Sequence, residues 1–294
     1  MVSASIQKYL NQFLTENLGL QISHLQWQAL GGGSINDTYR VKINDKTSFF
    51  LKINSASKYP GLFTKEKHGL EFLTKQKIIH IPSVVFYGAN DGYQVLLLEW
   101  IDRGSKTEQF WKKFGEELAA LHHITNSHFG FEEDNYMGSL PQINTQKANW
   151  IEFFVDCRLR PQVSMAEENH LLQARHLNAF ENLYLQLPNI FNEEKPFLLH
   201  GDLWSGNYMC DQFSEPVLID PAVYFGHRSM DLAMTTLFGG FDKSFYESYN
   251  YHFPFPSNHL EQWELCNLYP LLIHLNLFGF GYLGQIESTL ANFR

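Results

Sequence analysis

The chain reads His200-Gly201-Asp202-Leu203-Trp204-Ser205-Gly206-Asn207 in its second half, and Ile219-Asp220-Pro221 follows a short interval later. An aspartate such as Asp202 can orient an attacking hydroxyl group and accept its proton. Asn207 and Asp220 offer amide and carboxylate oxygens, which are the ligands that Mg²⁺ prefers. These residues predict phosphoryl transfer, with Asp202 as catalytic base and Asn207 and Asp220 as metal ligands.

The spacing of these residues matches a known pattern. Protein kinases carry an Asp and an Asn in H-R-D-x-x-x-x-N and a metal-binding Asp further on. Two other interpretations stay open at this point. Asp202 and Asn207 are also typical turn residues that bond to nearby backbone groups. His200 and Asp202 could instead bind a metal for hydrolysis, which is disfavoured because the sequence has no H-E-x-x-H motif.

A glycine-rich turn, Gly31-Gly32-Gly33-Ser34, stands near the N-terminus. Without Cβ atoms, successive backbone N–H groups can approach phosphate oxygens closely. Such turns also simply close hairpins. Because the segment leads into a strand-like pattern and not into a helix, it is unlike a Walker loop or a dinucleotide fingerprint. We expect Gly31, Gly32, Gly33 and Ser34 to bind nucleotide phosphates.

Lys52 is a lone cation in the apolar run Phe49-Phe50-Leu51-Lys52-Ile53. It corresponds in position to the kinase lysine that binds ATP phosphates, and a helix carboxylate must hold it. Glu66 is the preferred partner because it lies on the apolar side of the next predicted helix, and Glu71 is the alternative. A lysine that reaches from a sheet edge to solvent would explain the same residue.

The motifs occur in the order of a kinase: glycine loop, strand lysine, helix glutamate, connecting segment, catalytic Asp, Asn and second Asp. The connecting segment contains Glu99, Trp100 and Ile101. We expect backbone groups of Glu99 and Ile101 to bond the adenine edge of ATP, with Leu97 or Leu98 lining the pocket.

Hydrophobic periodicity predicts an α+β fold. An amphipathic helix opens the chain, and the following segments are expected as strands at 25–30, 38–43, 48–53, 83–87 and 93–99, with a helix at 63–76. Beyond residue 100 the pattern is mainly helical, with helices expected at 150–160 and 167–187. We predict a protein-kinase-like two-lobed fold. Its nucleotide-binding lobe (1–100) has a small antiparallel sheet with one main helix, and its catalytic and substrate-binding lobe (101–294) is mostly helical.

Composition narrows the class of protein. The chain has 22 Lys and Arg against 31 Asp and Glu, a net charge of −9, and no basic cluster, so a nucleic-acid partner is not expected. Three scattered cysteines indicate neither a zinc site nor a disulfide framework, and a reducing cytoplasm is the simplest expectation. The apolar stretch 268–284 is interrupted by polar residues and glycines, so a buried helix pair is expected there and no membrane span.

The sequence resembles the fructosamine/ketosamine kinases, which are relatives of aminoglycoside and choline kinases. The segments that carry the resemblance are Gly31-Gly32-Gly33-Ser34-Ile35, Phe50-Leu51-Lys52-Ile53-Asn54, Leu199 to Asn207, Ile219-Asp220-Pro221-Ala222, Gly226-His227-Arg228, and a middle stretch with Gln142, Asn144 and Arg158. The match extends over nearly the whole chain.

The resemblance implies ATP- and Mg²⁺-dependent phosphorylation of a sugar hydroxyl, expected at O3, on ketosamines such as fructosamine or ribulosamine adducts. That activity would make the adduct labile and reverse glycation. It also implies proton acceptance by Asp202, phosphate contacts from Lys52 and Glu66, metal contacts from Asn207 and Asp220, and bracing of the catalytic loop by Asp231. Trp204 and His274 are candidate substrate residues, although a buried anchoring role explains Trp204 equally well.

Three positions depart from the family pattern. Ser34 stands where many members have Cys, Ser229 where they show Glu, and Ile273 where they often show Asn. The last two leave the sugar and amine preference open. A kinase for another small alcohol (an aminoglycoside, choline or a thiamine precursor) remains an alternative, as does a non-catalytic nucleotide-binding scaffold. The sequence leaves the preferred ketosamine and the oligomeric state undetermined.

Overall fold

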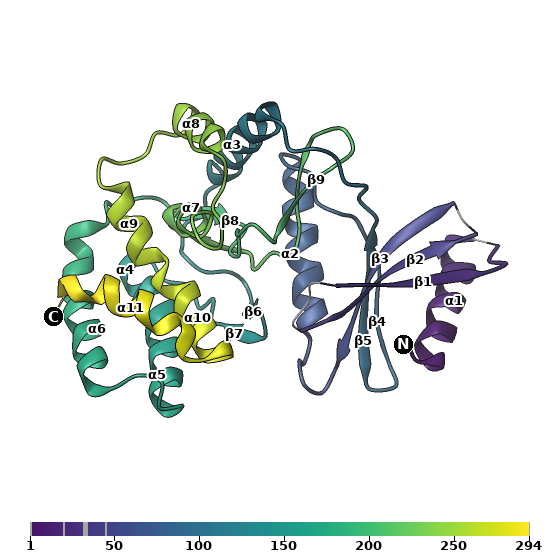
Figure 1. Cartoon of the computed structure of the whole chain (residues 1–294), viewed down its shortest axis with the longest axis horizontal. Helices are drawn as coiled ribbons and strands as arrows, with labels where there is room; N and C mark the ends of the chain where they lie inside the picture. Colours follow the sequence, from purple (N-terminus) through teal and green to yellow (C-terminus); the bar gives the residue numbers. More distant parts are fainter. Residues whose placement is uncertain (1, 20, 32–34, 45, 294) are drawn as a thin grey trace.

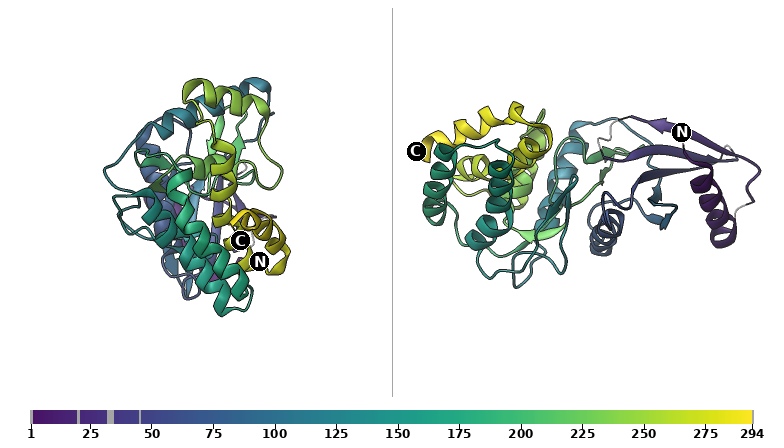
Figure 2. Two further views of the ribbon diagram at one scale, coloured as in Figure 1. Left: turned by 90° about the vertical axis from the view of Figure 1, so that its left-hand side faces the viewer. Right: turned by 90° about the horizontal axis from the view of Figure 1, so that it is seen from below.

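The computed structural model describes residues 2–19, 21–31, 35–44 and 46–293. It consists of two lobes that lie side by side, with the N-terminal residues at one end of the long axis and the C-terminal residues at the other (Figures 1 and 2). The two-lobed protein-kinase-like prediction is confirmed. Gly32, Gly33 and Ser34 lie outside the described residues.

The smaller lobe is built on one antiparallel sheet. Its strand order is β1-β2-β3-β5-β4. The elements are α1 (Ala4–Leu18), β1 (Leu25–Leu30), β2 (Asp37–Ile43), β3 (Thr47–Ser55), α2 (Leu62–Gln76), β4 (Val84–Asn90) and β5 (Tyr93–Glu99). All five strands and both helices of this lobe match the predicted segments to within a few residues.

The two faces of this sheet pack against different partners. Successive side chains on a strand point to opposite faces, so Leu51 of β3 and Leu97 of β5 face the helix α1, where Leu10 and Leu14 are buried with them. Lys52, Leu96 and Leu98 therefore face the other way, toward α2. The core on that side is continuous with the core of the larger lobe, which couples the lobes more tightly than a flexible tether would.

The larger lobe is mainly helical. Its helices are α3 (Glu108–His122), α4 (Trp150–Phe154), the π-helix η1 (Val155–Leu159), α5 (Arg160–Glu168), α6 (Ala174–Ile190), α7 (Ser229–Met234), α8 (Lys243–His252), α9 (His259–Cys266), α10 (Leu268–Phe278), η2 (Phe280–Tyr282), α11 (Leu283–Leu290) and η3 (Ala291–Phe293). Three two-stranded antiparallel sheets complete this lobe. They pair β6 (Asn135–Met137) with β7 (Leu140–Gln142), β8 (Phe197–Leu199) with β11 (Tyr224–Gly226), and β9 (Tyr208–Cys210) with β10 (Pro216–Leu218).

The structure corrects the prediction of a continuous helix over 167–187. α5 ends at Glu168, and His170 has a left-handed backbone (φ 58°) that no α-helix accommodates. A new helix then begins after Gln173, whose side chain accepts a bond from the His176 N–H while the His176 ring accepts one from the Gln173 N–H. The hydrophobic period continues across the break, which is why the pattern alone did not show it.

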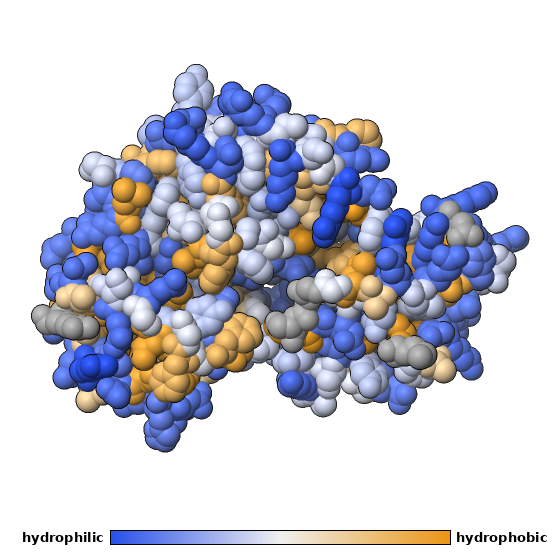
Figure 3. All heavy atoms as spheres, viewed as in Figure 1, coloured by the Kyte–Doolittle hydropathy of each residue, from blue (hydrophilic) through white to orange (hydrophobic). Residues whose placement is uncertain are grey.

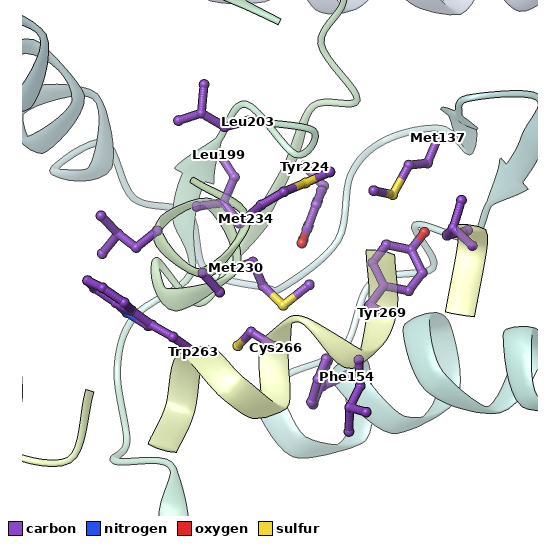
Figure 4. Close-up of a cluster of buried hydrophobic side chains, with 14 of the residues drawn as sticks. Met137, Phe154, Leu199, Leu203, Tyr224, Met230, Met234, Trp263, Cys266 and Tyr269 are labelled. Atoms are coloured by element: carbon purple, nitrogen blue, oxygen red, sulfur yellow. The ribbon is translucent and has the colours of Figure 1, made fainter. Parts of the chain in front are cut away.

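Buried apolar side chains support the loop that follows β8. Figure 4 shows Leu203 of this loop above Leu199, Tyr224 and Met234, with Cys266 and Tyr269 from α9 and α10 beneath them. The stretch 268–284 forms α10, η2 and the start of α11. Residues 268–273 and Leu275 are buried in this core, whereas Phe278 and Phe280 are exposed, so the prediction of a buried helix pair holds only for the first half of the stretch. Among the described residues, none of the helices is both long and apolar enough for a membrane span.

Candidate active site

The loop after β8 turns sharply at Gly201. Its φ of +86° and its distance from Ala222 require glycine, since an added Cβ would stand 2.0 Å from the Ala222 carbonyl oxygen. Buried Asp231, on α7, holds the turn by accepting hydrogen bonds from the His200 N–H (2.7 Å) and the Gly201 N–H (2.9 Å). Asp231 therefore braces the loop that presents Asp202.

The β9–β10 hairpin brings Asn207 next to the segment that carries Asp220. The two residues flank the hairpin, and the Ile219 N–H donates to the Asn207 carbonyl across its base (3.0 Å). The Asn207 amide group then donates to both the carbonyl and the carboxylate Oδ2 of Asp202, each at 2.8 Å. Asp202, Asn207 and Asp220 are thus brought together by the hairpin that the chain forms between Asn207 and Asp220.

The carboxyl group of Asp202 is partly removed from water. Burial raises the pKa of Asp202 to about 7, and the nearby charges of Asp220 and Asp231 act in the same direction, while the Asn207 hydrogen bond opposes them. A base is most effective when its pKa lies near the working pH. The environment thus favours proton exchange by Asp202 near neutral pH.

Lys52 links the two lobes through a buried ion-pair cluster. Its ammonium nitrogen lies 2.6 Å from Glu66 Oε1 on α2 and 2.7 Å from Asp220 Oδ1. Burial by itself lowers the pKa of Lys52, but the charges of Asp220 and Glu66 outweigh it and raise the pKa, so the side chain remains a cation. The rival Glu71 instead pairs with Lys67 at the surface.

Asp220 adopts an uncommon backbone conformation. Its φ is +56°, a left-handed value that few non-glycine residues adopt. Such a residue persists where its surroundings fix it, as the Lys52 contact and the bond from Ala222 N–H to the His200 carbonyl do here (2.9 Å). About two fifths of the Asp220 side chain remains exposed (41%), so the carboxylate is open to a ligand.

His200 is neutral and structural. It lies completely inside the protein, and burial lowers its pKa. Its Nδ1 accepts from the Asp202 N–H (3.3 Å), so Nε2 carries the proton and donates to the Ile219 carbonyl (2.9 Å). One imidazole therefore ties the Asp202 turn to the Asp220 segment, which disfavours a metal-ligand role for His200.

The donor set around Asn207 and Asp220 fits a divalent cation. Asn207 bonds Asp202 through its NH₂ group, so its amide oxygen takes no part in that contact. Asp220 adds a partly exposed carboxylate. An amide oxygen and a carboxylate are the hard donors that Mg²⁺ binds in proteins, usually together with water and phosphate oxygens.

Of the remaining predicted nucleotide contacts, Gly31 is exposed. Asn36, just before β2, accepts a bond through Oδ1 from the Asn54 amide of β3 (2.8 Å). At the connecting segment, the Glu99 N–H already donates to the Ser83 carbonyl (2.9 Å). Of the two pocket candidates, Leu98 lies on the Lys52 side of the sheet and Leu97 lies on the α1 side.

Trp100 and Ile101 complete the connecting segment between the lobes. The Trp100 indole N–H donates to Asp102 Oδ1 (2.9 Å), and the guanidinium of Arg40 lies over its ring at 4.2 Å. Ile101 is buried. The Trp100 ring is therefore held in place by Arg40 and Asp102.

The two candidate substrate residues lie close to each other on the larger lobe. Trp204 is half-buried, and its ring covers Gly206 and meets Phe238 edge to face, with centroids 6.0 Å apart. His274 lies on the other side of Phe238, with centroids 4.7 Å apart. Trp204 is partly buried and packs against the core of the lobe, which is compatible both with the anchoring role and with a substrate contact.

Two of the departures from the family pattern lie in the core. Ser229 is buried, and its hydroxyl donates to Gln262 Oε1 (2.9 Å). Ile273 is also buried, in α10. Because both side chains are buried, neither Ser229 nor Ile273 contacts a substrate directly, and neither sets the sugar preference by direct contact.

Sequence reasoning missed the residues that hold the site from beneath. The His122 ring contacts Asp231 Oδ2 through Nε2 (3.3 Å) and the Tyr249 hydroxyl through Nδ1 (2.8 Å). Gln142 donates to the Ala222 carbonyl (3.1 Å), next to Asp220. Gln142 appeared only through the family resemblance, and His122 carried no signal because its partners are distant in sequence.

Comparison with known proteins gives one consistent answer. The family model described as fructosamine kinase matches residues 6–293. An Enterococcus faecium protein named "Probable ketoamine kinase" is 38% identical over 264 residues (89% of this chain, 93% of that protein). The Arabidopsis thaliana "Protein-ribulosamine 3-kinase, chloroplastic" is 37% identical over 288 residues (95% of this chain, 85% of that protein).

The fold comparison agrees with the sequence comparison. A crystal structure of a Haemophilus somnus protein assigned as a fructosamine-3-kinase superposes with a TM-score of 0.87 at 26% identity, covering 97% of this chain and 96% of that one. The chain belongs to the fructosamine kinase family and is an ATP-dependent phosphotransferase that acts on a hydroxyl group.

Proposed function

We propose that the chain phosphorylates a sugar hydroxyl, O3, of ketosamines and thereby starts the removal of these adducts from amines. The observation that carries the proposal is the convergence of Lys52, Glu66 and Asp220 with the Asp202–Asn207 pair where the two lobes meet. The names of the relatives, ketoamine kinase and ribulosamine 3-kinase, support the acceptor class. Figure 3 shows the surface hollowed between the lobes, beside the tip of α10 and the β6–β7 hairpin.

In this proposal, residues 1–100 bind the nucleotide and residues 101–294 carry the catalytic and acceptor sites. Backbone groups of the turn at Gly31 and the ammonium of Lys52 contact the ATP phosphates, with Glu66 holding Lys52 in place. The Glu99 carbonyl and the Ile101 N–H bond the adenine edge. Since the Glu99 N–H is used within the sheet, its carbonyl is the group left for this contact.

Asp202 accepts the proton of the attacking hydroxyl. The acceptor oxygen then forms a bond to the γ-phosphorus of ATP while the bond from that phosphorus to the bridging oxygen breaks, and ADP leaves. Mg²⁺, held by Asn207 and Asp220, would neutralise charge on the phosphates. Asp231 and His200 contribute by keeping the Asp202 turn in a single geometry.

The three cysteine thiols are free and buried, which supports the proposal that the enzyme works in a reducing compartment such as the cytoplasm.

A product-identified assay tests the acceptor class. Purified protein is incubated with ATP and Mg²⁺ and with fructosyl-lysine, ribulosyl-lysine, choline or an aminoglycoside, and the phosphorylated product is located by NMR. We expect phosphate on the sugar of one or both ketosamines and none on choline or the aminoglycoside. Phosphorylation of choline or the aminoglycoside alone would contradict the proposal, and ATP binding without any turnover would favour a non-catalytic scaffold.

A further inference from the structure

Five aromatic side chains form a cluster on the larger lobe: Trp204, Phe238, His274, Phe278 and Tyr282. His274 is its centre, with ring centroids 4.7 Å from Phe238, 4.9 Å from Tyr282 and 5.5 Å from Phe278. Trp204 joins through Phe238 at 6.0 Å. The members come from the catalytic loop, the turn after α7, and α10 with the following η2. Three separate parts of the chain therefore converge to make it.

This aromatic cluster is open to solvent. Phe238 is 38% exposed and Phe278 is 55% exposed, and neighbouring Phe280 is 62% exposed. Most aromatic side chains of the lobe, such as Phe114 and Phe153, are buried. Figure 3 shows hydrophobic side chains gathered over the end of α10, at the border of the hollow between the lobes. Contiguous exposed apolar surface of this kind marks ligand or partner sites.

Phe238 has an unfavourable backbone conformation. Its φ is +54°, a conformation that a bulky residue rarely adopts, and Gly239 and Gly240 after it also have positive φ values. The Ser205 hydroxyl on the catalytic loop donates to the Phe238 carbonyl (3.1 Å) and ties the turn to that loop. Strain retained at an exposed aromatic residue points to a function for the ring.

The aromatic cluster begins directly beside the catalytic base. The Trp204 N–H donates to the Asp202 carbonyl (3.1 Å), so the Trp204 ring leaves the same turn that presents the Asp202 carboxylate. From there the rings lead outward, through Phe238 and His274 to Phe278. A substrate whose hydroxyl reaches Asp202 would extend over these rings.

The chemistry of a ketosamine matches such a surface. Its amine nitrogen lies only a few bonds from the hydroxyl that is phosphorylated, and it is a cation near neutral pH. Faces of aromatic rings attract cations and stack with apolar groups. Burial lowers the pKa of His274, so at neutral pH this ring does not repel the amine. Cation–π pairs among the described residues use other rings, such as Trp100 under Arg40.

We infer that the aromatic cluster is the subsite for the amine half of the acceptor, and that it favours amines with an apolar or aromatic substituent. This inference rests on the proposed ketosamine kinase function and adds a preference to it. The aromatic cluster contacts the amine part of the acceptor, while the Asp202 turn contacts the sugar part. Because ring contacts are weakly directional, the subsite accepts a range of apolar carriers.

The test compares two acceptors that share one sugar. Ribulosyl adducts (or fructosyl adducts, whichever is turned over) of 2-phenylethylamine and of methylamine are assayed with wild type and Phe278→Ala. Wild type should prefer the phenylethyl adduct in kcat/KM. Phe278→Ala should lower the ratio of the two kcat/KM values about fivefold to tenfold, mainly through KM, which is the size of one aromatic contact.

Matched variants separate the ring from general effects. Phe213→Ala removes a similarly exposed ring (74%) on the β9–β10 turn and should leave the ratio unchanged. Phe278→Leu keeps an apolar side chain and covers the case in which the alanine variant is poorly folded, and it should lower the ratio by a smaller factor.

The possible outcomes distinguish the inferred amine subsite from the proposed ketosamine kinase function. Turnover of both adducts with a ratio that neither Phe278 variant changes would overturn the inference and leave the kinase function intact. Turnover of neither adduct would overturn both. An unchanged ratio with a shift toward monomer in sedimentation of Phe278→Ala would assign the surface to a second copy of the chain, which also contradicts the inference.

Discussion

The catalytic centre and the aromatic cluster lie side by side but are built in opposite ways. At the centre, the ammonium nitrogen of Lys52 lies 2.6 Å from Glu66 Oε1 and 2.7 Å from Asp220 Oδ1, and Lys52 is only 2% exposed. In the aromatic cluster the contacts are between rings, and Phe278 is more than half exposed. The catalytic centre is held by directional ion pairs and hydrogen bonds, whereas the aromatic cluster is held by contacts between partly exposed rings.

This difference follows from what each region must recognise. Phosphoryl transfer concentrates charge on a few oxygen atoms, so it requires charges and dipoles held in place before the reaction. A carrier amine has no fixed shape, and its recognition can use non-directional contacts. We therefore expect substitutions in the centre to lower the rate strongly, with a loss of stability where the Lys52 ion pair is broken, and substitutions in the aromatic cluster to change preference.

The largest expected effect is at Asp202. Asp202→Asn keeps a side chain of the same size near Asn207 but removes the proton acceptor, so kcat should fall by roughly 10²–10⁴-fold. Initial rates with a ketosamine measure the loss. ATP affinity and the unfolding midpoint serve as controls and should change little. More than half of the wild-type kcat in this variant would contradict the role of Asp202.

Lys52 should affect both activity and stability. Lys52→Met leaves Glu66 as a buried carboxylate without its partner, which should cost about 3 kcal/mol of unfolding free energy. Phosphate contacts are lost as well, so kcat/KM for ATP should fall at least about 100-fold. Urea unfolding and steady-state rates measure the two effects.

The double variant Lys52→Met/Glu66→Gln tests the coupling. It removes the unpaired charge, so it should recover most of the lost stability without recovering activity. Recovery of neither would show that the ion pair is not the source of the destabilisation.

Buried histidines make the stability of the larger lobe depend on pH. Burial lowers the pKa of His227 to about 4, although the charge of Glu194 opposes the shift. The unfolded chain binds a proton near pH 6.5 that the folded chain does not bind until about pH 4, so unfolding free energy falls as pH drops through this window. The loss should be roughly 2 kcal/mol between pH 6.5 and 4.5.

His227→Asn retains an acceptor for the Ser229 N–H and removes the titrating ring. Urea midpoints at pH 7 and pH 4.5 should differ less in this variant than in wild type. His252→Gln, at the exposed end of α8, is the control and should keep the wild-type difference. Equal pH dependence in all three proteins would contradict the assignment.

The smallest effect is expected at Ser229. Ser229→Ala removes one buried hydrogen bond to Gln262 and should cost about 1 kcal/mol of stability. Because Ser229 has no exposed contact with the acceptor side, the ratio of ribulosyl to fructosyl turnover should stay within about twofold of wild type. A larger change in that ratio would mean that Ser229 acts on the site through the core.

Much of the smaller lobe could be predicted because its strands are runs rich in β-branched, aromatic and other apolar residues, and its turns carry Gly, Asn and Asp. The choice of Glu66 over Glu71 also came from helical spacing. The three-residue strands β6, β7 and β11 were not predicted. β11 forms by pairing with β8, a segment distant in the chain, which the local sequence does not specify. β6 and β7 pair with each other in a small hairpin. The break at His170 was missed because the hydrophobic period continues across it.

The sequence alone determined which groups react, because the residue types and the spacing of Asp202, Asn207, Asp220 and Lys52 match a recognisable pattern. Their convergence is decided by the tertiary structure: Asp231 and His200 fix the Asp202 turn, and Lys52 reaches across the cleft to Asp220. The aromatic cluster belongs mainly to this second level. His274, Phe278 and Tyr282 are near neighbours in sequence, but Phe238 and Trp204 are distant from them. Packing of α10 against the turn after α7, and of that turn against the catalytic loop, brings the rings together.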